Sequence, residues 1–113
     1  MVELRGLGDI HKRLAEKGGA VIAICADKIA DCRRVKEKNK LPFNILSDEK
    51  LVTISAYGLL FHEPMRKTDI ALPANFLLNR SGKIAWKWIA PRVQDRVDAS
   101  VVDAEVVKLL RAE

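Results

Sequence analysis

The chain has 113 residues, of which 49% are hydrophobic and 31% are charged, as in one ordinary small globular domain. This amount of apolar material argues against a disordered chain. The net charge is +5, but Lys and Arg are spread along the whole sequence. A nucleic-acid binder clusters them on one face and interleaves aromatic residues, so we expect no nucleic-acid partner. The longest apolar run, residues 20–26, is too short to span a membrane. We expect no membrane association and a cytoplasmic location.

Cysteine and histidine are too scarce for metal chemistry. The two cysteines, Cys25 and Cys32, are separated by six residues, which matches no common zinc spacing. The two histidines, His11 and His62, lie far apart in the sequence. We therefore expect neither a metal site nor a cofactor.

The first predicted elements are a helix and a strand. Apolar residues recur at helical spacing over residues 3–16, and Gly18-Gly19 ends this helix. Gly6 and Gly8 each lower its propensity by up to about 1 kcal/mol relative to Ala, so the helix depends on packing. The run 20–26 (AVIAICA) then predicts a strand that is buried on both faces.

A second helix follows this strand. Asp27 is a favourable capping residue for a helix that continues to about Asn39. Its periodicity places Ile29 and Cys32 on the inner side. Residues 44–46 then form a short extended segment.

The middle of the chain predicts a third helix and a loop. Ser47 and Asp48 are cap residues for the helix, Ile54 faces inward, and Gly58 closes it. Residues 59–72 contain Pro64 and a polar centre, so we expect a loop there.

The last third of the chain predicts a hairpin and a helix. Residues 75–79 and 84–90 flank a tight glycine turn, the pattern of two antiparallel strands. A final helix over 101–112 has Ser100 and Asp103 in positions that resemble a capping box. The resulting order, α-β-α-β-α-β-β-α, indicates the α/β class. Strand alternation places three large side chains of the hairpin on one face: Ile84, Trp86 and Trp88.

Four segments in this order resemble the peroxiredoxin and redoxin branch of the thioredoxin superfamily, the alkyl hydroperoxide reductase and thiol-specific antioxidant type. Together they extend over nearly the whole chain. They are Glu3-Leu4-Arg5 with Leu7, Ala20 to Asp27 (AVIAICAD), Leu41 to Asp48 (LPFNILSD) with Ala56-Tyr57-Gly58, and Leu72 to Trp86 (LPANFLLNRSGKIAW).

The resemblance implies a thioredoxin-like fold, a mixed sheet flanked by helices. It also implies a single redoxin domain over residues 1–113 that is truncated at the N-terminus, because the family's first strand and active-site turn would precede Met1. In that fold the missing strand lies between the strand at 20–26 and the hairpin strand near Phe76. Its absence predicts a gap in the middle of the sheet with unpaired backbone groups. The sheet could close up, another chain could fill the gap, or the native protein could be longer.

The family's activity is thiol-dependent reduction of peroxides or disulfides, so the resemblance implies an antioxidant oxidoreductase. Its usual catalytic cysteine would fall before Met1 and is absent from this chain, which leaves open whether the chain is an active enzyme. Cys32 is the candidate redox thiol, because some family members keep a resolving cysteine on the corresponding helix. Packing is the alternative role of Cys32. The resemblance also places a substrate-binding groove at Leu72, Pro73 and Ala74, with a cis bond before Pro73.

Two further readings stay open at this point. One is a non-catalytic thioredoxin-like module for binding or oligomerisation, and the other is an unusual enzyme that uses Cys32. Exposed strand edges pair readily, so we expect a homodimer or a higher homo-oligomer. The resemblance further implies a thiol reductant as partner, either a protein or a small thiol.

Overall fold

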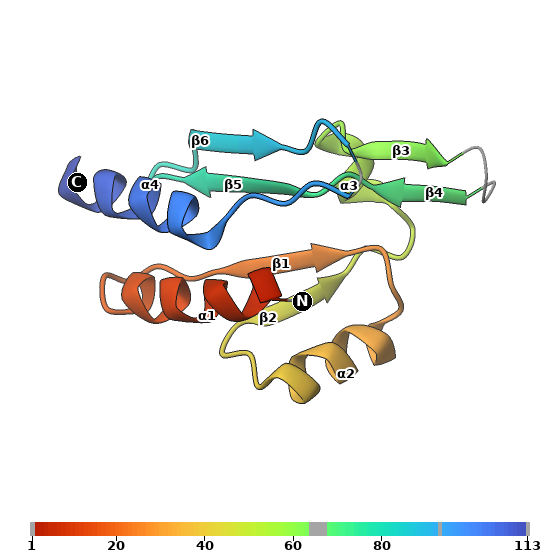
Figure 1. The fold of residues 1–113 in the computed structure, drawn as a ribbon, viewed down its shortest axis with the longest axis horizontal. Coiled ribbons are helices and arrows are strands. Elements are labelled where there is room, and N and C mark those ends of the chain that lie inside the picture. Colours follow the sequence, from red (N-terminus) through yellow and green to blue (C-terminus); the bar gives the residue numbers. More distant parts are fainter. Residues whose placement is uncertain (1, 64–67, 93, 113) are drawn as a thin grey trace.

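The computed structural model describes residues 2–63, 68–92 and 94–112 (Figure 1). No helix in this part of the chain is long and apolar enough to cross a membrane. In chain order the elements are α1 (Val2–Ala15), β1 (Ile22–Cys25), α2 (Ile29–Asn39), β2 (Asn44–Ser47), α3 (Val52–Ala56), β3 (Leu60–Glu63), β4 (Thr68–Ala71), β5 (Ala74–Leu78), β6 (Ile84–Ile89) and α4 (Ala99–Ala112).

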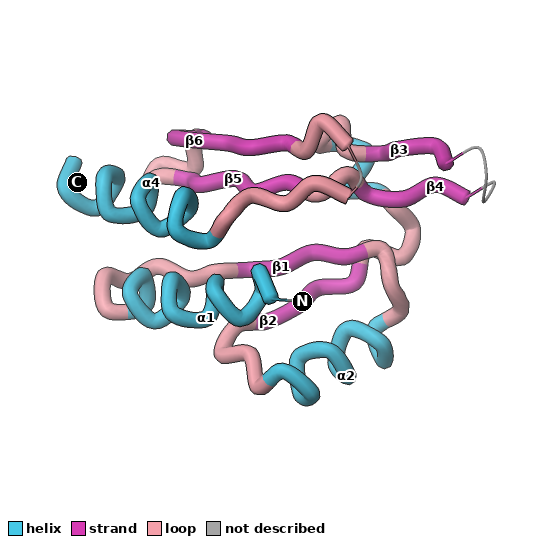
Figure 2. Tube along the Cα trace, viewed as in Figure 1, coloured by secondary structure: helices cyan, strands magenta, loops and turns pink. Residues whose placement is uncertain are grey.

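The strands form three separate pairs (Figure 2). β1 and β2 are parallel, whereas β3–β4 and β5–β6 are antiparallel. The predicted hairpin is present as β5–β6. The loop predicted over residues 59–72 was wrong in part, because β3 and β4 pair there from Leu60↔Ala71 to Glu63↔Thr68. Cross-strand pairing outweighed the polar composition that favoured a loop.

The largest core cluster joins the two terminal helices. Ile10 of α1 packs with Val102 and Val106 of α4, and each is at most 7% exposed. Side chains from both strand pairs reach this cluster, including Val21 just before β1 and Leu77 of β5. The α1–α4 layer therefore holds the β1–β2 and β5–β6 pairs together on one side, as Figure 1 shows.

The gap that the sequence predicts between the two strand pairs is present. In Figure 1, β5 lies between β6 and β1, but among the described residues β1 pairs only with β2 and β5 pairs only with β6. The sheet has not closed up by altered pairing.

The prediction that residues 20–26 form a strand buried on both faces was wrong. Ile22 is 61% and Ile24 is 46% exposed, whereas Ala23 and Cys25 are half-buried. A continuous apolar run indicates burial on both faces only where other elements cover both faces of the sheet. Ile22 and Ile24 share one face of β1, and that face is exposed.

Two of the predicted helix starts differ in detail. The cap of α2 is Lys28, which makes no side-chain capping hydrogen bond, and Ile29 is 61% exposed rather than inward. At α4 the capping side chain is Asp98, whose Oδ1 accepts hydrogen bonds from the backbone N–H and the hydroxyl of Ser100 at 2.9 Å each. These two donors hold the pKa of Asp98 below its ordinary value.

The predicted third helix is confirmed as α3, but its N-cap is Leu51 rather than the predicted Ser47 or Asp48, and Leu51 makes no side-chain capping hydrogen bond. Asp48 Oδ2 accepts a hydrogen bond from the N–H of Ile54 at 2.7 Å, and Ile54 is buried. Gly58 ends the helix with φ +73°, which a glycine adopts without strain.

The predicted apolar stripe on β6 is interrupted. Trp86 pairs with Leu77, but the next pair is Ile84 with Leu78, because the register shifts between Leu77 and Leu78. The shift leaves Ile84 51% exposed, whereas Trp86 and Trp88 are half-buried. A bulge adds one residue to a strand and changes which side chains share a face.

Candidate functional site

The candidate redox thiol, Cys32, lies in the first half of α2 and is only 2% exposed. Its Sγ donates a hydrogen bond to the carbonyl oxygen of Asp27 at 3.7 Å. Cys25, at the end of β1, is close enough to raise the pKa of the Cys32 thiol. Both cysteines are free thiols. The fold therefore places the two cysteines of the chain near each other.

The pKa of the Cys32 thiol is raised to about 12, mainly by burial and then by the neighbouring Cys25, Asp27 and Asp31. The buried site disfavours the thiolate, and the nearby negative charges do the same. Because the thiolate is the nucleophile, Cys32 reacts slowly at neutral pH.

A groove of about 550 Å³ runs beside Cys32, between α2 and β2. Its walls carry three basic side chains of α2 and its cap, Arg33, Lys36 and Lys40. The Lys36 ammonium donates a hydrogen bond to Asn44 Oδ1 at 2.8 Å, which ties the helix to the strand. The groove gives a small molecule a route toward the helix face that carries Cys32.

The predicted substrate-binding residues, Leu72, Pro73 and Ala74, lie between β4 and the start of β5 and are half-buried. The expected cis bond before Pro73 was wrong, because no peptide bond among the described residues is cis. The backbone here is used within the chain: the N–H of Leu72 donates to the carbonyl of Leu59 at 2.8 Å, and the carbonyl of Pro73 accepts from the N–H of Ala90 at 2.9 Å. These bonds keep the backbone before Pro73 from turning outward.

The groove beside Cys32 is not lined by Leu72, Pro73 or Ala74. The candidate thiol and the predicted substrate-binding residues therefore do not share this groove. Substrate binding at these three residues stays a prediction.

The two histidines do not indicate a metal site. His11 Nδ1 accepts a hydrogen bond from the N–H of Val21 at 2.9 Å, and its ring lies 6.0 Å from that of Phe43. The His62 side chain lies outside the described residues. Over the part of the chain that the structure describes, no group of three His, Cys, Asp or Glu side chains could hold a metal ion.

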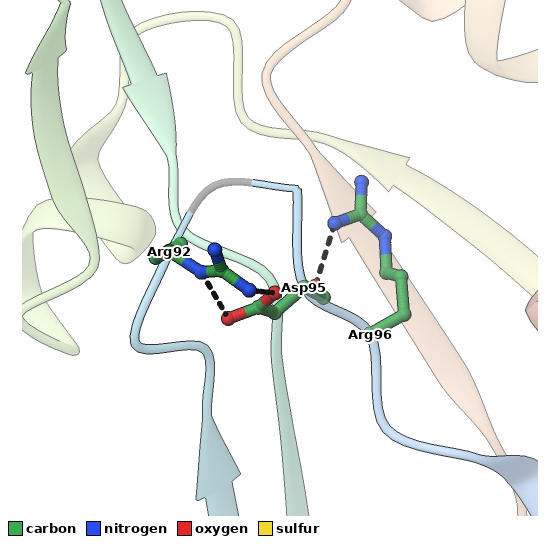
Figure 3. Close-up of polar contacts among 3 residues, drawn as sticks. All are labelled: Arg92, Asp95 and Arg96. Atoms are coloured by element: carbon green, nitrogen blue, oxygen red, sulfur yellow. Dashed lines mark hydrogen bonds and ion pairs between the residues drawn. The ribbon is translucent and has the colours of Figure 1, made fainter.

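Sequence reasoning missed an arginine cluster in the loop after β6. Arg92 makes two hydrogen bonds to the carboxylate of Asp95, at 3.0 and 3.2 Å, and the Arg96 guanidinium donates to the carbonyl of Asp95 at 2.8 Å (Figure 3). Arg96 also lines a cavity of about 20 Å³ with Leu7 of α1 and Asn75 of β5. The available signal was the Arg-x-x-Asp spacing, which is common in ordinary turns.

Comparisons with known proteins agree with this fold. The model of the AhpC/TSA family matches residues 2–87. A Coxiella burnetii protein named as a peroxiredoxin (bcp) is 31% identical over 107 residues, which covers 93% of this chain and 67% of the relative.

Solved peroxiredoxins superpose on nearly the entire chain. The Xylella fastidiosa PrxQ C47S mutant has a TM-score of 0.78 at 17% identity, over 99% of this chain and 69% of its own. Mycobacterium tuberculosis peroxidoxin BcpB has a TM-score of 0.78 at 15% identity, over 97% of this chain and 68% of its own. The chain therefore belongs to the AhpC/TSA family and has the thioredoxin-like fold of the peroxiredoxins.

Proposed function

We propose that this chain takes part in thiol-dependent reduction of hydroperoxides or disulfides, with Cys32 as its redox thiol. Family membership supports the reaction class. A Xanthomonas campestris neighbour, bacterioferritin comigratory protein, has alkyl peroxide reduction activity. The observation that carries the proposal for this chain is that buried Cys32, on α2, lies near Cys25, at the end of β1.

Two neighbouring thiols can reduce a hydroperoxide in two balanced steps. The Cys32 thiolate attacks the terminal peroxide oxygen, the O–O bond breaks, and the products are an alcohol and a Cys32 sulfenic acid. The Cys25 thiol then attacks the sulfenic sulfur, releases water and forms a disulfide. An external thiol reductant supplies two electrons and two protons and restores both thiols.

The test measures peroxide consumption with dithiothreitol as reductant. We expect slow turnover that is lost in Cys32→Ser. Because the pKa of Cys32 is raised to about 12, the thiolate fraction and the rate should rise about tenfold for each pH unit from 7 to 9. The same assay without protein measures direct oxidation of dithiothreitol. Turnover that is absent in the wild type, or unchanged in Cys32→Ser, would show the proposal to be wrong.

Cys25→Ser is the matched variant, because it keeps Cys32 but removes the second thiol. Peroxide treatment without reductant should leave a stable sulfenic acid in Cys25→Ser and a disulfide in the wild type. Trapping with dimedone and intact mass distinguish these two products. Absence of both products would contradict the two-thiol mechanism.

The proposal includes the expected partners. Leu72, Pro73 and Ala74 are proposed as a substrate-binding segment that is separate from the groove beside Cys32. The proposed reductant is a small thiol or a thiol protein. A cytoplasmic location agrees with the two free cysteines, because reducing compartments keep thiols reduced.

We include a homo-oligomer in the proposal, supported by exposed apolar side chains on β5 and β6. Leu78, Ile84 and Ile89 are 39–51% exposed. Light scattering over a range of concentrations tests this assembly, and a 12.6 kDa monomer at high concentration would contradict it.

A further inference from the structure

We infer that the groove between α2 and β2 is a binding site for a small amphipathic carboxylate, a molecule with one acidic head and an apolar tail. The groove has a volume of about 550 Å³, which is typical of small-molecule sites. In Figure 1, α2 lies beside β2 and the two elements run in opposite directions. The end of the helix therefore lies near the start of the strand. This inference concerns binding and is independent of the proposed thiol chemistry.

The groove is basic where α2 ends. Lys36, in the last turn of α2, and Lys40, its C-cap, line the groove there together with Asn44, the first residue of β2. Lys36 is half-buried, and its ammonium donates to Asn44 Oδ1 at 2.8 Å. Arg33 lines the same groove about one helical turn before Lys36. Among the described residues that line the groove, Glu37 is the one acidic side chain, which leaves a surplus of two positive charges.

Two of these cations have no acidic partner within the described part of the chain. Neither the guanidinium of Arg33 nor the ammonium of Lys40 forms an ion pair there. In contrast, Arg34, the next residue on the same helix, lies outside the groove lining and pairs with Asp31 at 3.2 Å. A carboxylate in the groove would form charge-assisted hydrogen bonds with such cations.

The backbone of Lys40 supplies a second, independent observation. Lys40 has φ +51°, in the left-handed region where helix ends usually have glycine. Any side chain disfavours this conformation relative to glycine, because its Cβ comes too close to the following carbonyl oxygen. The chain nevertheless has a lysine here, and this lysine lines the groove. A residue held in a sparsely populated conformation at the wall of a groove is typical of a binding site.

The opposite end of the groove is apolar. Ile29, at the start of α2, and Leu46, near the end of β2, line the groove there. Ile29 is 61% and Leu46 is 49% exposed, so an alkyl chain that covers them would remove apolar surface from water. The 11 residues of α2 extend over about 16 Å, which leaves room for a medium-length alkyl chain between the two ends.

A carboxylate with an apolar tail matches both ends of the groove. A simple anion such as phosphate would leave Ile29 and Leu46 exposed to water. A neutral lipid or an apolar polypeptide segment would cover these side chains but would leave the cations at the other end without a partner. Charge complementarity therefore favours the amphipathic anion over these other occupants.

Titration with octanoate, followed by NMR of the backbone amides, tests the site. We expect saturable shifts at Lys40, Asn44 and Leu46, and no comparable shifts in α4. Octanamide has the same chain without the charge, and acetate has the charge without the chain. Octanoate should bind at least about fivefold tighter than octanamide and at least about tenfold tighter than acetate. Equal binding of octanoate and either control would overturn the inference, and so would the absence of shifts, as expected if a polypeptide segment covered the groove.

Two neighbouring arginines provide a matched pair of variants. Arg33→Gln removes a cation from the groove wall, whereas Arg34→Gln removes the same charge from a position outside the groove. We expect about threefold weaker octanoate binding for Arg33→Gln and less than about 1.5-fold for Arg34→Gln, because exposed charges are screened over about 10 Å. Circular dichroism checks that both variants fold. Equal losses in the two variants would overturn a local site.

Lys40→Gly separates binding from folding. Glycine adopts the φ of +51° without strain, so this variant should melt a few degrees higher than the wild type. It also loses a cation of the groove, so it should bind octanoate about threefold more weakly. Unchanged binding in this variant would overturn the inference, and a lower melting temperature would contradict the strain that supports it.

Salt provides the last control on the wild type. Octanoate binding should weaken several-fold when the salt concentration is raised from about 0.02 to 0.5 M, whereas octanamide binding should not weaken. A loss that is equal for both ligands would overturn recognition of the charge. None of these measurements involves a peroxide or a reductant, so their outcome is distinguishable from that of the test of the proposed thiol chemistry.

Discussion

The α1–α4 helix layer and the strands β1 and β5 differ in how completely they are packed. On one side, Ile10, Val102 and Val106 are at most 7% exposed and receive side chains from both strand pairs. In β1, Ile22 and Ile24 remain 46–61% exposed, and within the described part of the chain no strand pairs with the edge of β1 that faces β5. The helices therefore complete their layer within the chain, whereas the sheet does not.

This difference shows which contacts hold the molecule together. Side-chain packing between helices joins segments at opposite ends of the chain without any hydrogen-bonded ladder. A sheet, in contrast, is continuous only where neighbouring strands are present at pairing distance. Packing against α1 and α4 therefore holds the β1–β2 and β5–β6 pairs together, in place of hydrogen bonds between their strands.

The largest expected effect comes from Ile10→Ala. The side chain is 3% exposed, so its removal leaves a cavity in the α1–α4 cluster and should lower the free energy of unfolding by about 2–5 kcal/mol. The matched change is Ile22→Ala in β1, where the side chain is 61% exposed. It should lower the free energy of unfolding by about 0.5 kcal/mol or less. Urea denaturation measures both. Similar losses would mean that the gap side is packed as tightly as the helix side.

A smaller effect is expected from two glycines of α1. A Cβ at Gly6 would lie 2.7 Å from Cβ of Ala99 in α4, so Gly6→Ala should cost about 1–3 kcal/mol through overpacking. A Cβ at Gly8 would lie 3.4 Å from its nearest neighbour, an atom of Pro42, which is an ordinary contact distance. Gly8→Ala should therefore stabilise the protein by up to about 1 kcal/mol through higher helix propensity. Thermal unfolding compares the two variants, and stabilisation by Gly6→Ala would contradict the close approach of α1 and α4.

The smallest effect concerns the pH dependence of Cys32. Its pKa is about 12 in the folded protein, against an ordinary value of 9.0. Above pH 9 the unfolded chain loses this proton while the folded chain keeps it, so stability falls as pH rises. Cys32→Ala removes that contribution, and the wild type should lose up to about 1.4 kcal/mol more per pH unit between pH 9 and 10.5. Parallel stability curves for the two proteins would contradict the buried, protonated thiol.

Local patterns in the sequence determined most of the elements. Helical periodicity predicted α1, α2 and α4, and the glycine turn between two extended runs predicted β5–β6. The sequence also indicated that Asp48 serves the start of α3. Its carboxylate accepts the free N–H of Ile54, although the N-cap position itself is Leu51. These features depend on residues that are near one another in the chain.

The candidate site was predicted only in part. The sequence indicated Cys32 but not its proximity to Cys25, because seven positions along the chain do not specify how a strand end meets a helix. The trans bond before Pro73 depends on the partners Leu59 and Ala90, which no local pattern indicates.

The sequence by itself determined where the chain is helical or extended and to which family it is similar. Only the tertiary structure decided that β1 is half exposed, that Ile84 leaves the Trp86 face, and that the sheet stays open between β1 and β5. The physical reason is that an apolar side chain is buried, and a main-chain group is paired, only when a distant segment is present to cover it.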